Sequence, residues 1–210
     1  MGRVIGSGIE DVLPLPWIPK LLKGGRKPTA LEILSSAQWR CASCGRPHEG
    51  GFALAAFAPD PWRGAESYEH NGAIRLGGDF LSEDFCVIDG KYFMVRARLD
   101  IPVHGIVEPF SFGAWSTLSR ANFDKYLSGF DHGDYPDMGP WPGWLCNKLE
   151  NYLADDPLAI WVAPQTDHQR PKLFVQADDH PLAIDQDNGI SPERVLEFYE
   201  YYGHRPADLL

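Results

Sequence analysis

Two cysteines are the residues of this sequence whose spacing points most directly to chemistry. Cys41 and Cys44 form a Cys-x-x-Cys pair that Gly45 follows at once. Two thiolates at this spacing can share one tetrahedral ion, and glycine permits the tight turn that brings backbone N–H groups to the sulfurs. The pair supplies only two ligands, so a closed zinc site requires two more.

The remaining ligands must be thiols or imidazoles from elsewhere in the chain. The predicted metal set is Cys41, Cys44, His48 and Cys86, with His70 as a further candidate. A site closed by four protein ligands would be structural, since it leaves no open position for a substrate. Two alternatives stay open: a cysteine pair that binds no metal, and a dithiol that cycles through a disulfide.

Carboxylates and imidazoles also gather around a predicted strand near the C-terminus. Asp167 and His168 lie before this strand, and Asp179 and His180 follow it. A carboxylate beside an imidazole suits general acid/base catalysis or a hydrolytic metal, because the acid orients the ring and raises its basicity. The run Asp-Asp-His-Pro also indicates a strand-ending turn with local capping bonds, and we favour the turn.

A third group of side chains lies in the segment from Phe130 to Trp144, which is rich in glycine, proline, acids and aromatics. Aromatics amid acids could bind a cationic ligand or a basic protein partner. The competing interpretation is that Trp141 and Trp144 fill the open end of the sheet, because aromatics commonly supply core area. The candidate residues for binding a ligand or partner are Trp141, Trp144, Asp179 and His180.

Composition and charge restrict the class of protein. The chain has 210 residues, of which 44% are hydrophobic, and a formal net charge of -10. Such a charge repels phosphate backbones and anionic membranes, so we expect neither nucleic acid nor a membrane as partner. The sequence contains no signal peptide and no apolar run of transmembrane length, which predicts a cytoplasmic protein. Phosphate-loop, nucleophile-elbow and His-Glu-x-x-His motifs are also missing, which weakens the case for common nucleotide and hydrolase chemistries.

Residues 1–40 are predicted to form an N-terminal arm that ends in a short amphipathic helix. The prolines between Leu13 and Pro28 exclude regular helix and central strand. Thr29 and Glu32 then form a capping-box pattern at the start of a helix that should end near Trp39. The apolar side of this helix needs a partner in its own domain or in a second subunit, so a homodimer through the arm is one hypothesis.

Residues 41–210 are predicted to form a single α+β domain. Asp89-Gly90 separates two β-prone runs and fits the type I′ turn of a hairpin that ends at Ile101. A strand from Phe110 to Leu118 precedes a helix capped by Ser119. A strand pair and a last helix follow, at Leu158–Ala163, Lys172–Ala177 and Ser191–Tyr202. Strands that arrive as hairpins predict an antiparallel sheet with flanking helices.

Five short blocks of the chain form a specific combination, although each block alone is weak. They are Cys41–Gly45 with His48, Cys86–Gly90 continuing to Arg96, Phe112–Trp115, Gly143–Leu145 and Asp179–Ala183. In this combination the chain resembles a bacterial family catalogued as a domain of unknown function, DUF2199, over roughly Cys41 to Tyr202. The resemblance implies no activity and therefore no catalytic residue. The matched positions include all four residues of the predicted metal set. Cys146 stands where the family is expected to have serine, so it is a poor candidate for a shared ligand.

The sequence therefore predicts a non-enzymatic protein-interaction or regulatory domain that is stabilised by structural zinc. Its acidity would steer a basic protein partner. One alternative is a metal-dependent or acid/base hydrolase that uses the region of Asp179 and His180. A weaker alternative is a thiol redox protein that uses Cys41 and Cys44.

Overall fold

The computed structural model describes residues 26–36, 38–135, 138–152 and 156–206. Most of the proline-rich stretch from Leu13 to Pro28 lies outside these residues, so its assignment as an arm stays a prediction. None of the described helices is long and apolar enough to cross a lipid bilayer.

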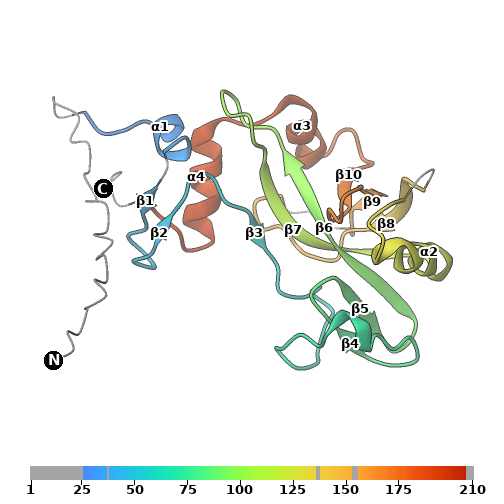
Figure 1. Cartoon of the computed structure of the whole chain (residues 1–210). Helices are drawn as coiled ribbons and strands as arrows, with labels where there is room; N and C mark the ends of the chain where they lie inside the picture. The colour runs from blue at the N-terminus through green and yellow to red at the C-terminus, as the bar shows by residue number, and fades with distance from the viewer. Residues whose placement is uncertain (1–25, 37, 136–137, 153–155, 207–210) are drawn as a thin grey trace, which may run out of the picture.

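A strongly curled sheet forms the centre of the fold (Figure 1). Its strand order is β3-β7-β6-β10-β9-β8, and β4 joins it through β5, which pairs with β6. The strands are β3 (Leu54–Ala55), β4 (Phe80–Leu81), β5 (Phe85–Ile88), β6 (Tyr92–Ile101), β7 (Phe110–Leu118), β8 (Trp141–Trp144), β9 (Ala159–Ala163) and β10 (Lys172–Val175).

The sheet is mixed, so the prediction of an antiparallel sheet is wrong, although the combination of helices and strands is confirmed. β10 runs parallel to β6, and β3 runs parallel to β7, while the remaining neighbours are antiparallel. Parallel neighbours require a long connection, and here the chain passes through a helix and three further strands between β6 and β10. Local turn residues therefore predicted the hairpins but not the direction of these distant pairs.

The predicted hairpin is present as β5 and β6, with β7 antiparallel to β6 on its other side. Asp89 and Gly90 have φ values of 55° and 61°, as both central residues of a type I′ turn must. The Lys91 N–H donates to the carbonyl of Ile88 over 3.0 Å and closes the turn.

The curl brings β8 back to β7, so that the strands from β7 through β6, β10 and β9 to β8 enclose a partial barrel. Leu145 forms an antiparallel bridge with Ser116, and the Cys146 N–H donates to the Trp115 carbonyl over 2.8 Å. The Trp144 N–H donates to the Thr117 hydroxyl over 2.9 Å. Residues that alternate inward from these strands are fully or almost fully buried, among them Val95, Ala97, Leu99, Phe112, Ile160, Val162 and Leu173.

Two helices pack against the sheet. α2 (Arg120–Phe130) contacts β6 and β7 and begins at the predicted cap, because the Ser119 hydroxyl accepts from the Asn122 N–H. α3 (Pro181–Asn188) contacts β6 and β10. Its Gln186 amide donates to carbonyls of both strands and accepts from the Val175 N–H at 2.9 Å. This side chain joins β10 to β6 where their own ladder ends.

The remaining elements gather at one end of the molecule (Figure 1). α1 (Ala30–Leu34) contacts α4 (Pro192–Tyr201), and the hairpin of β1 (Trp39–Arg40) and β2 (Pro47–His48) follows α1. The predicted capping box of Thr29 and Glu32 is confirmed. The helix ends five residues before the predicted Trp39, which belongs to β1. The buried face of α1 packs within its own chain and needs no second subunit for this purpose.

Candidate metal centre

The β1–β2 hairpin positions the cysteine pair. Cys41 follows β1, and its N–H donates to the Arg46 carbonyl over 3.0 Å. Gly45 has a φ of 70°, and its N–H donates to the Cys41 carbonyl over 3.0 Å. Glycine adopts this left-handed conformation without the strain that a side chain would add. The resulting turn places His48, at the end of β2, beside the thiol of Cys44.

The chain segment after α4 returns to the same hairpin. Gly203 turns the chain out of the helix with a φ of 81°. The Ala42 N–H then donates to the Arg205 carbonyl over 2.6 Å, and Cys41 forms an antiparallel bridge with Pro206. This short pairing delivers His204 to the cysteines from the far end of the sequence.

Four side chains converge at this point. The ligand atoms of Cys41, Cys44, His48 and His204 all lie within 4.8 Å of one another. The Cys44 sulfur is 3.4 Å from Nε2 of His48. Nδ1 of His204 is buried and has no hydrogen-bond partner among the described residues, as expected of a nitrogen reserved for a metal. Two sulfurs and two imidazoles are the donor set of tetrahedral zinc sites, so these residues fit that ion.

The Cys41 sulfur lies in an environment that favours the thiolate. Burial by itself would raise the pKa of Cys41, but hydrogen bonds from the backbone of Cys44, Arg205 and Ser43 outweigh it and lower the pKa to about 6. The N–H groups of Cys44 and Arg205 lie 3.4 and 3.3 Å from this sulfur. N–H groups that point at a ligating sulfur stabilise its negative charge, which is the second-sphere arrangement expected around a metal thiolate.

Aromatic packing holds the histidines in place. His48 stacks on Phe52 with ring centroids 4.5 Å apart, and Phe52 stacks on Tyr199 of α4 at 4.2 Å. The Tyr199 hydroxyl accepts from the Phe52 N–H and donates to its carbonyl. His204 meets His48 edge to face at 5.0 Å. Both imidazoles therefore rest on a stack that is anchored in the core.

Cys86, which was predicted to be the fourth ligand, lies elsewhere. It is fully buried in β5 and packs with Leu81, Met94 and Trp115, on the side of the sheet away from the main core. Burial raises the pKa of its thiol to about 12. His70 is also outside the metal group, since its Nδ1 accepts from the Gly72 N–H at 3.0 Å. The structure places His204 in the position that the sequence assigned to Cys86.

The predicted Asp-His cluster is divided between the two ends of β10. His168 precedes the strand, whereas His180 follows it and caps α3 by accepting from the Leu182 N–H at 3.2 Å. This bond agrees with the interpretation of the Asp179-His180 run as a turn with local capping. Asp167 and Asp179 are both exposed.

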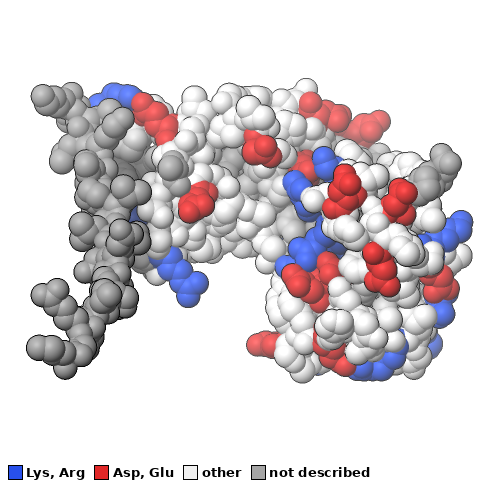
Figure 2. All heavy atoms as spheres, in the orientation of Figure 1, with Lys and Arg blue, Asp and Glu red and all other residues white. Residues whose placement is uncertain are grey.

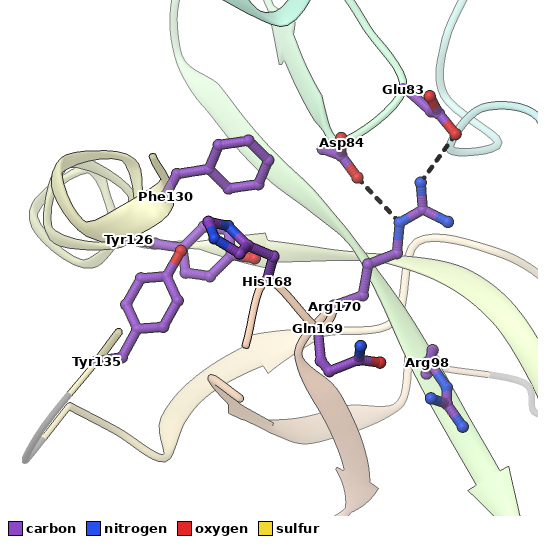
Figure 3. A pocket seen from close by; sticks show the side chains of 9 residues that line it. All are labelled: Glu83, Asp84, Arg98, Tyr126, Phe130, Tyr135, His168, Gln169 and Arg170. Carbon is purple, nitrogen blue, oxygen red and sulfur yellow. Dashed lines mark hydrogen bonds and ion pairs between the residues drawn. The ribbon is translucent and has the colours of Figure 1, made fainter. Parts of the chain in front are cut away.

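His168 lines a separate pocket, shown in Figure 3, in which aromatic rings face a charged wall. Arg170 donates from Nε to Asp84 over 2.9 Å and from Nη2 to Glu83 over 3.1 Å. On the other side are the rings of Tyr126 and Tyr135, stacked 4.9 Å apart. Burial, as the largest cause, raises the pKa of both tyrosines, that of Tyr135 to about 12. The two carboxylates of this pocket are already paired with an arginine.

The conformation of His168 is unusual. Asp167 and His168 have φ values of 56° and 57°, and the Gln169 N–H donates to the Thr166 carbonyl over 3.1 Å. These residues form a turn of the type I′ class, in which glycine or asparagine is the common choice. A Cβ on the facing Gly133 would lie 2.7 Å from the imidazole, so the chain passes directly over this ring. The histidine is held in place by the loop that follows α2.

The two tryptophans of the aromatic-acidic segment have different environments. Trp141 is 8% exposed and belongs to the core, whereas Trp144 is 52% exposed. They stand on opposite faces of the same strand, β8, because they are three residues apart. The sequence interpretation treated them as a pair, and the strand periodicity separates them.

Comparison with known proteins identifies a family. A family model described as an uncharacterised protein conserved in bacteria, DUF2199, matches residues 40–190. No curated protein and no solved structure matches the chain. The matched range contains Cys41, Cys44 and His48 and ends before His204.

Proposed function

The chain belongs to the DUF2199 family of uncharacterised bacterial proteins, and we propose that it is a non-enzymatic protein-interaction domain whose two ends are joined by structural zinc. Cys41, Cys44, His48 and His204 hold the ion in this proposal. The observation that carries it is the convergence of these four ligand atoms within 4.8 Å.

The number and origin of the ligands favour a structural role for the metal. Four protein ligands satisfy tetrahedral zinc and leave no position for water or substrate. Three of them come from one short hairpin, and His204 follows α4. An ion at this place cross-links residues that are more than 150 positions apart, and its binding energy therefore contributes to the stability of the folded state.

Two observations support an interaction role over catalysis. The acids of the pocket in Figure 3 both accept hydrogen bonds from Arg170, so neither carboxylate is free to act as a general base. Large aromatic side chains are exposed elsewhere on the surface, among them Trp144 and Trp161. Exposed aromatics on a protein of charge -10, whose acidic residues are spread over the face shown in Figure 2, suit a partner that carries both apolar and basic groups.

Metal content and thiol reactivity test the zinc site together. Cys44 is exposed, whereas the raised pKa of about 12 makes Cys86 and Cys146 slow to react with alkylating reagents. We expect one zinc per chain, no fast thiol before chelation, and rapid alkylation of Cys44 after chelation. Protein that is free of zinc and whose Cys44 reacts at once would contradict the proposal. A disulfide between Cys41 and Cys44 in protein purified without reductant would instead favour the redox alternative.

A further inference from the structure

The outer surface of β8, β9 and β10 carries a continuous row of exposed apolar side chains. Phe174 of β10 stands directly opposite Trp161 of β9, and Trp161 stands opposite Pro142 of β8. Trp144 lies two residues beyond Pro142 and so on the same face. Phe174, Trp161 and Trp144 are 47%, 40% and 52% exposed. We call Phe174, Trp161, Pro142 and Trp144 together the aromatic face.

The aromatic face is separate from the hydrophobic core. The inward positions of the same strands are filled by Ile160, Val162 and Leu173, which are at most 1% exposed. Outward positions of a half-buried strand are normally polar. Adjacent strands lie about 4.8 Å apart, so rings in register on three strands form one surface. A contiguous exposed aromatic surface of this kind is characteristic of a binding site.

Acidic residues border the aromatic face at one end. The register places Val175 opposite Ile160 and Trp144 opposite Ala159, so the chain before β9 and the chain after β10 meet beside Trp144. These two segments carry the exposed residues Asp156, Asp178 and Asp179. At the other end, Lys172 is paired with Asp100 at 3.4 Å. The surface therefore offers aromatic rings followed by negative charge.

We propose that the aromatic face binds the N-terminal segment Leu13–Lys23 of a second copy of this chain. The segment reads Leu-Pro-Leu-Pro-Trp-Ile-Pro-Lys-Leu-Leu-Lys, in which prolines alternate with apolar residues before two lysines. Proline-rich segments dock on exposed aromatic rings at a small entropic cost because they are already extended. Lys20 and Lys23 follow the apolar part of the segment, just as the acidic residues lie at one end of the aromatic face. This inference deepens the interaction role proposed above and does not depend on zinc.

The position of the segment favours a second copy over the same molecule. The described chain begins at Arg26 next to α1, at the end of the molecule opposite to β8, β9 and β10 (Figure 1). Trp17 lies only nine positions before Arg26, and nine extended residues span at most about 32 Å. A compact domain of this size is roughly 40 Å across. Trp17 can therefore reach the aromatic face of a neighbour more easily than its own, and reciprocal docking would give a closed dimer.

The test combines a peptide with the shortened and the full-length chain. A fluorescent peptide of residues 12–24 is titrated into protein that lacks residues 1–25, and anisotropy is measured. We expect saturable binding that falls at least ~10-fold in Trp161→Ser and in Phe174→Ser, since buried aromatic anchors dominate such interfaces. The matched control is Tyr92→Ser, which removes a 58% exposed aromatic from β6 and should leave binding unchanged. Zinc content of each variant shows separately whether the metal site is intact.

Sedimentation of the intact chain decides between the possible occupants. The full-length protein should form a dimer, and both removal of residues 1–25 and Trp161→Ser should yield monomers that still contain zinc. A peptide that does not bind, or binds Trp161→Ser as well as the parent protein, overturns the proposal. A full-length chain that stays monomeric above the peptide's dissociation constant also overturns it and assigns the segment to its own molecule. A full-length protein that forms the dimer but contains no zinc would contradict the structural-zinc proposal alone.

Discussion

Replacement of His204 by alanine tests the assignment that sequence reasoning missed. His204 supplies one of four ligand atoms that lie within 4.8 Å of one another, and its Nδ1 has no hydrogen-bond partner in the described structure. Alanine leaves zinc with three protein ligands and removes the ring contacts with His48 and Phe52 at 5.0 and 5.2 Å. The backbone hydrogen bonds of the neighbouring Arg205 stay possible, so the segment after α4 can still pair with the hairpin.

The size of the effect follows from ligand number. Loss of a residue that only supports a metal ligand typically lowers affinity 10- to 100-fold, so loss of the ligand itself should cost at least ~100-fold. At zinc concentrations that saturate both proteins, this corresponds to about 2.7 kcal/mol of folding free energy. For a chain of this length each 1 kcal/mol moves the melting temperature by about 2–4 °C, which predicts a decrease of roughly 5–11 °C in His204→Ala.

The assay is thermal unfolding with and without a chelator. Chelation should lower the melting temperature of both zinc-saturated proteins, and the decrease should be roughly 5–11 °C smaller for His204→Ala than for the parent. His204→Cys keeps a ligand atom and should retain both zinc and the response to chelator, whereas His132→Ala, which changes an exposed histidine outside the site, should behave like the parent. A His204→Ala protein that holds one zinc per chain and melts at the parent temperature would refute the reasoning.

Three further predictions concern pH, backbone strain and the charged pocket. In metal-free protein the folded-state pKa of Cys41 is about 6, below its unfolded value. The thiolate therefore contributes its full stabilisation above the unfolded pKa, and this contribution is lost as the pH falls through 6. Between pH 9 and pH 6, the melting temperature of Cys41→Ser should therefore fall less steeply than that of the parent protein. In Gly133→Ala the new Cβ lies 2.7 Å from the imidazole of His168 at a backbone φ of 63°, so the free energy of unfolding in urea should decrease by about 1–3 kcal/mol. In the control Gly77→Ala the Cβ meets open space, and the free energy of unfolding should be nearly unchanged. Asp84→Asn removes a carboxylate whose side chain is 16% exposed, and it should lower the free energy of unfolding by about 1–3 kcal/mol. Glu83→Gln changes a side chain that is 64% exposed and should lower it by less than about 1 kcal/mol. Equal decreases would show that burial does not decide the strength of these ion pairs.

Elements whose signals are local could be predicted from the sequence. The Asp89-Gly90 turn, the Ser119 cap and the capping box of Thr29 all act over at most four residues, and the structure contains each of them. The last helix likewise begins after Ser191 and stops before Gly203. These signals depend on backbone geometry and hydrogen bonds that the neighbouring residues supply themselves.

Features that depend on distant contacts were missed. β8 consists of Trp-Pro-Gly-Trp, which local propensity assigns to a loop, but pairing with β9 makes it a strand. α3 starts at Pro181, where the sequence suggested only a turn, because proline at the first helical position and a turn share the same residues. His204 could not be found from spacing, since it reaches Cys41 only when α4 has packed against α1. A histidine directly after a helix-ending glycine was the available signal.

X-ray absorption at the zinc edge of the purified full-length protein tests the central claim most directly. The account predicts one zinc per chain with two sulfur ligands at about 2.3 Å and two imidazole nitrogens at about 2.0 Å. His204→Ala should change the nitrogen count and leave both sulfurs. Three sulfur ligands, an oxygen from water in the parent protein, or the absence of zinc would contradict a closed site made by Cys41, Cys44, His48 and His204.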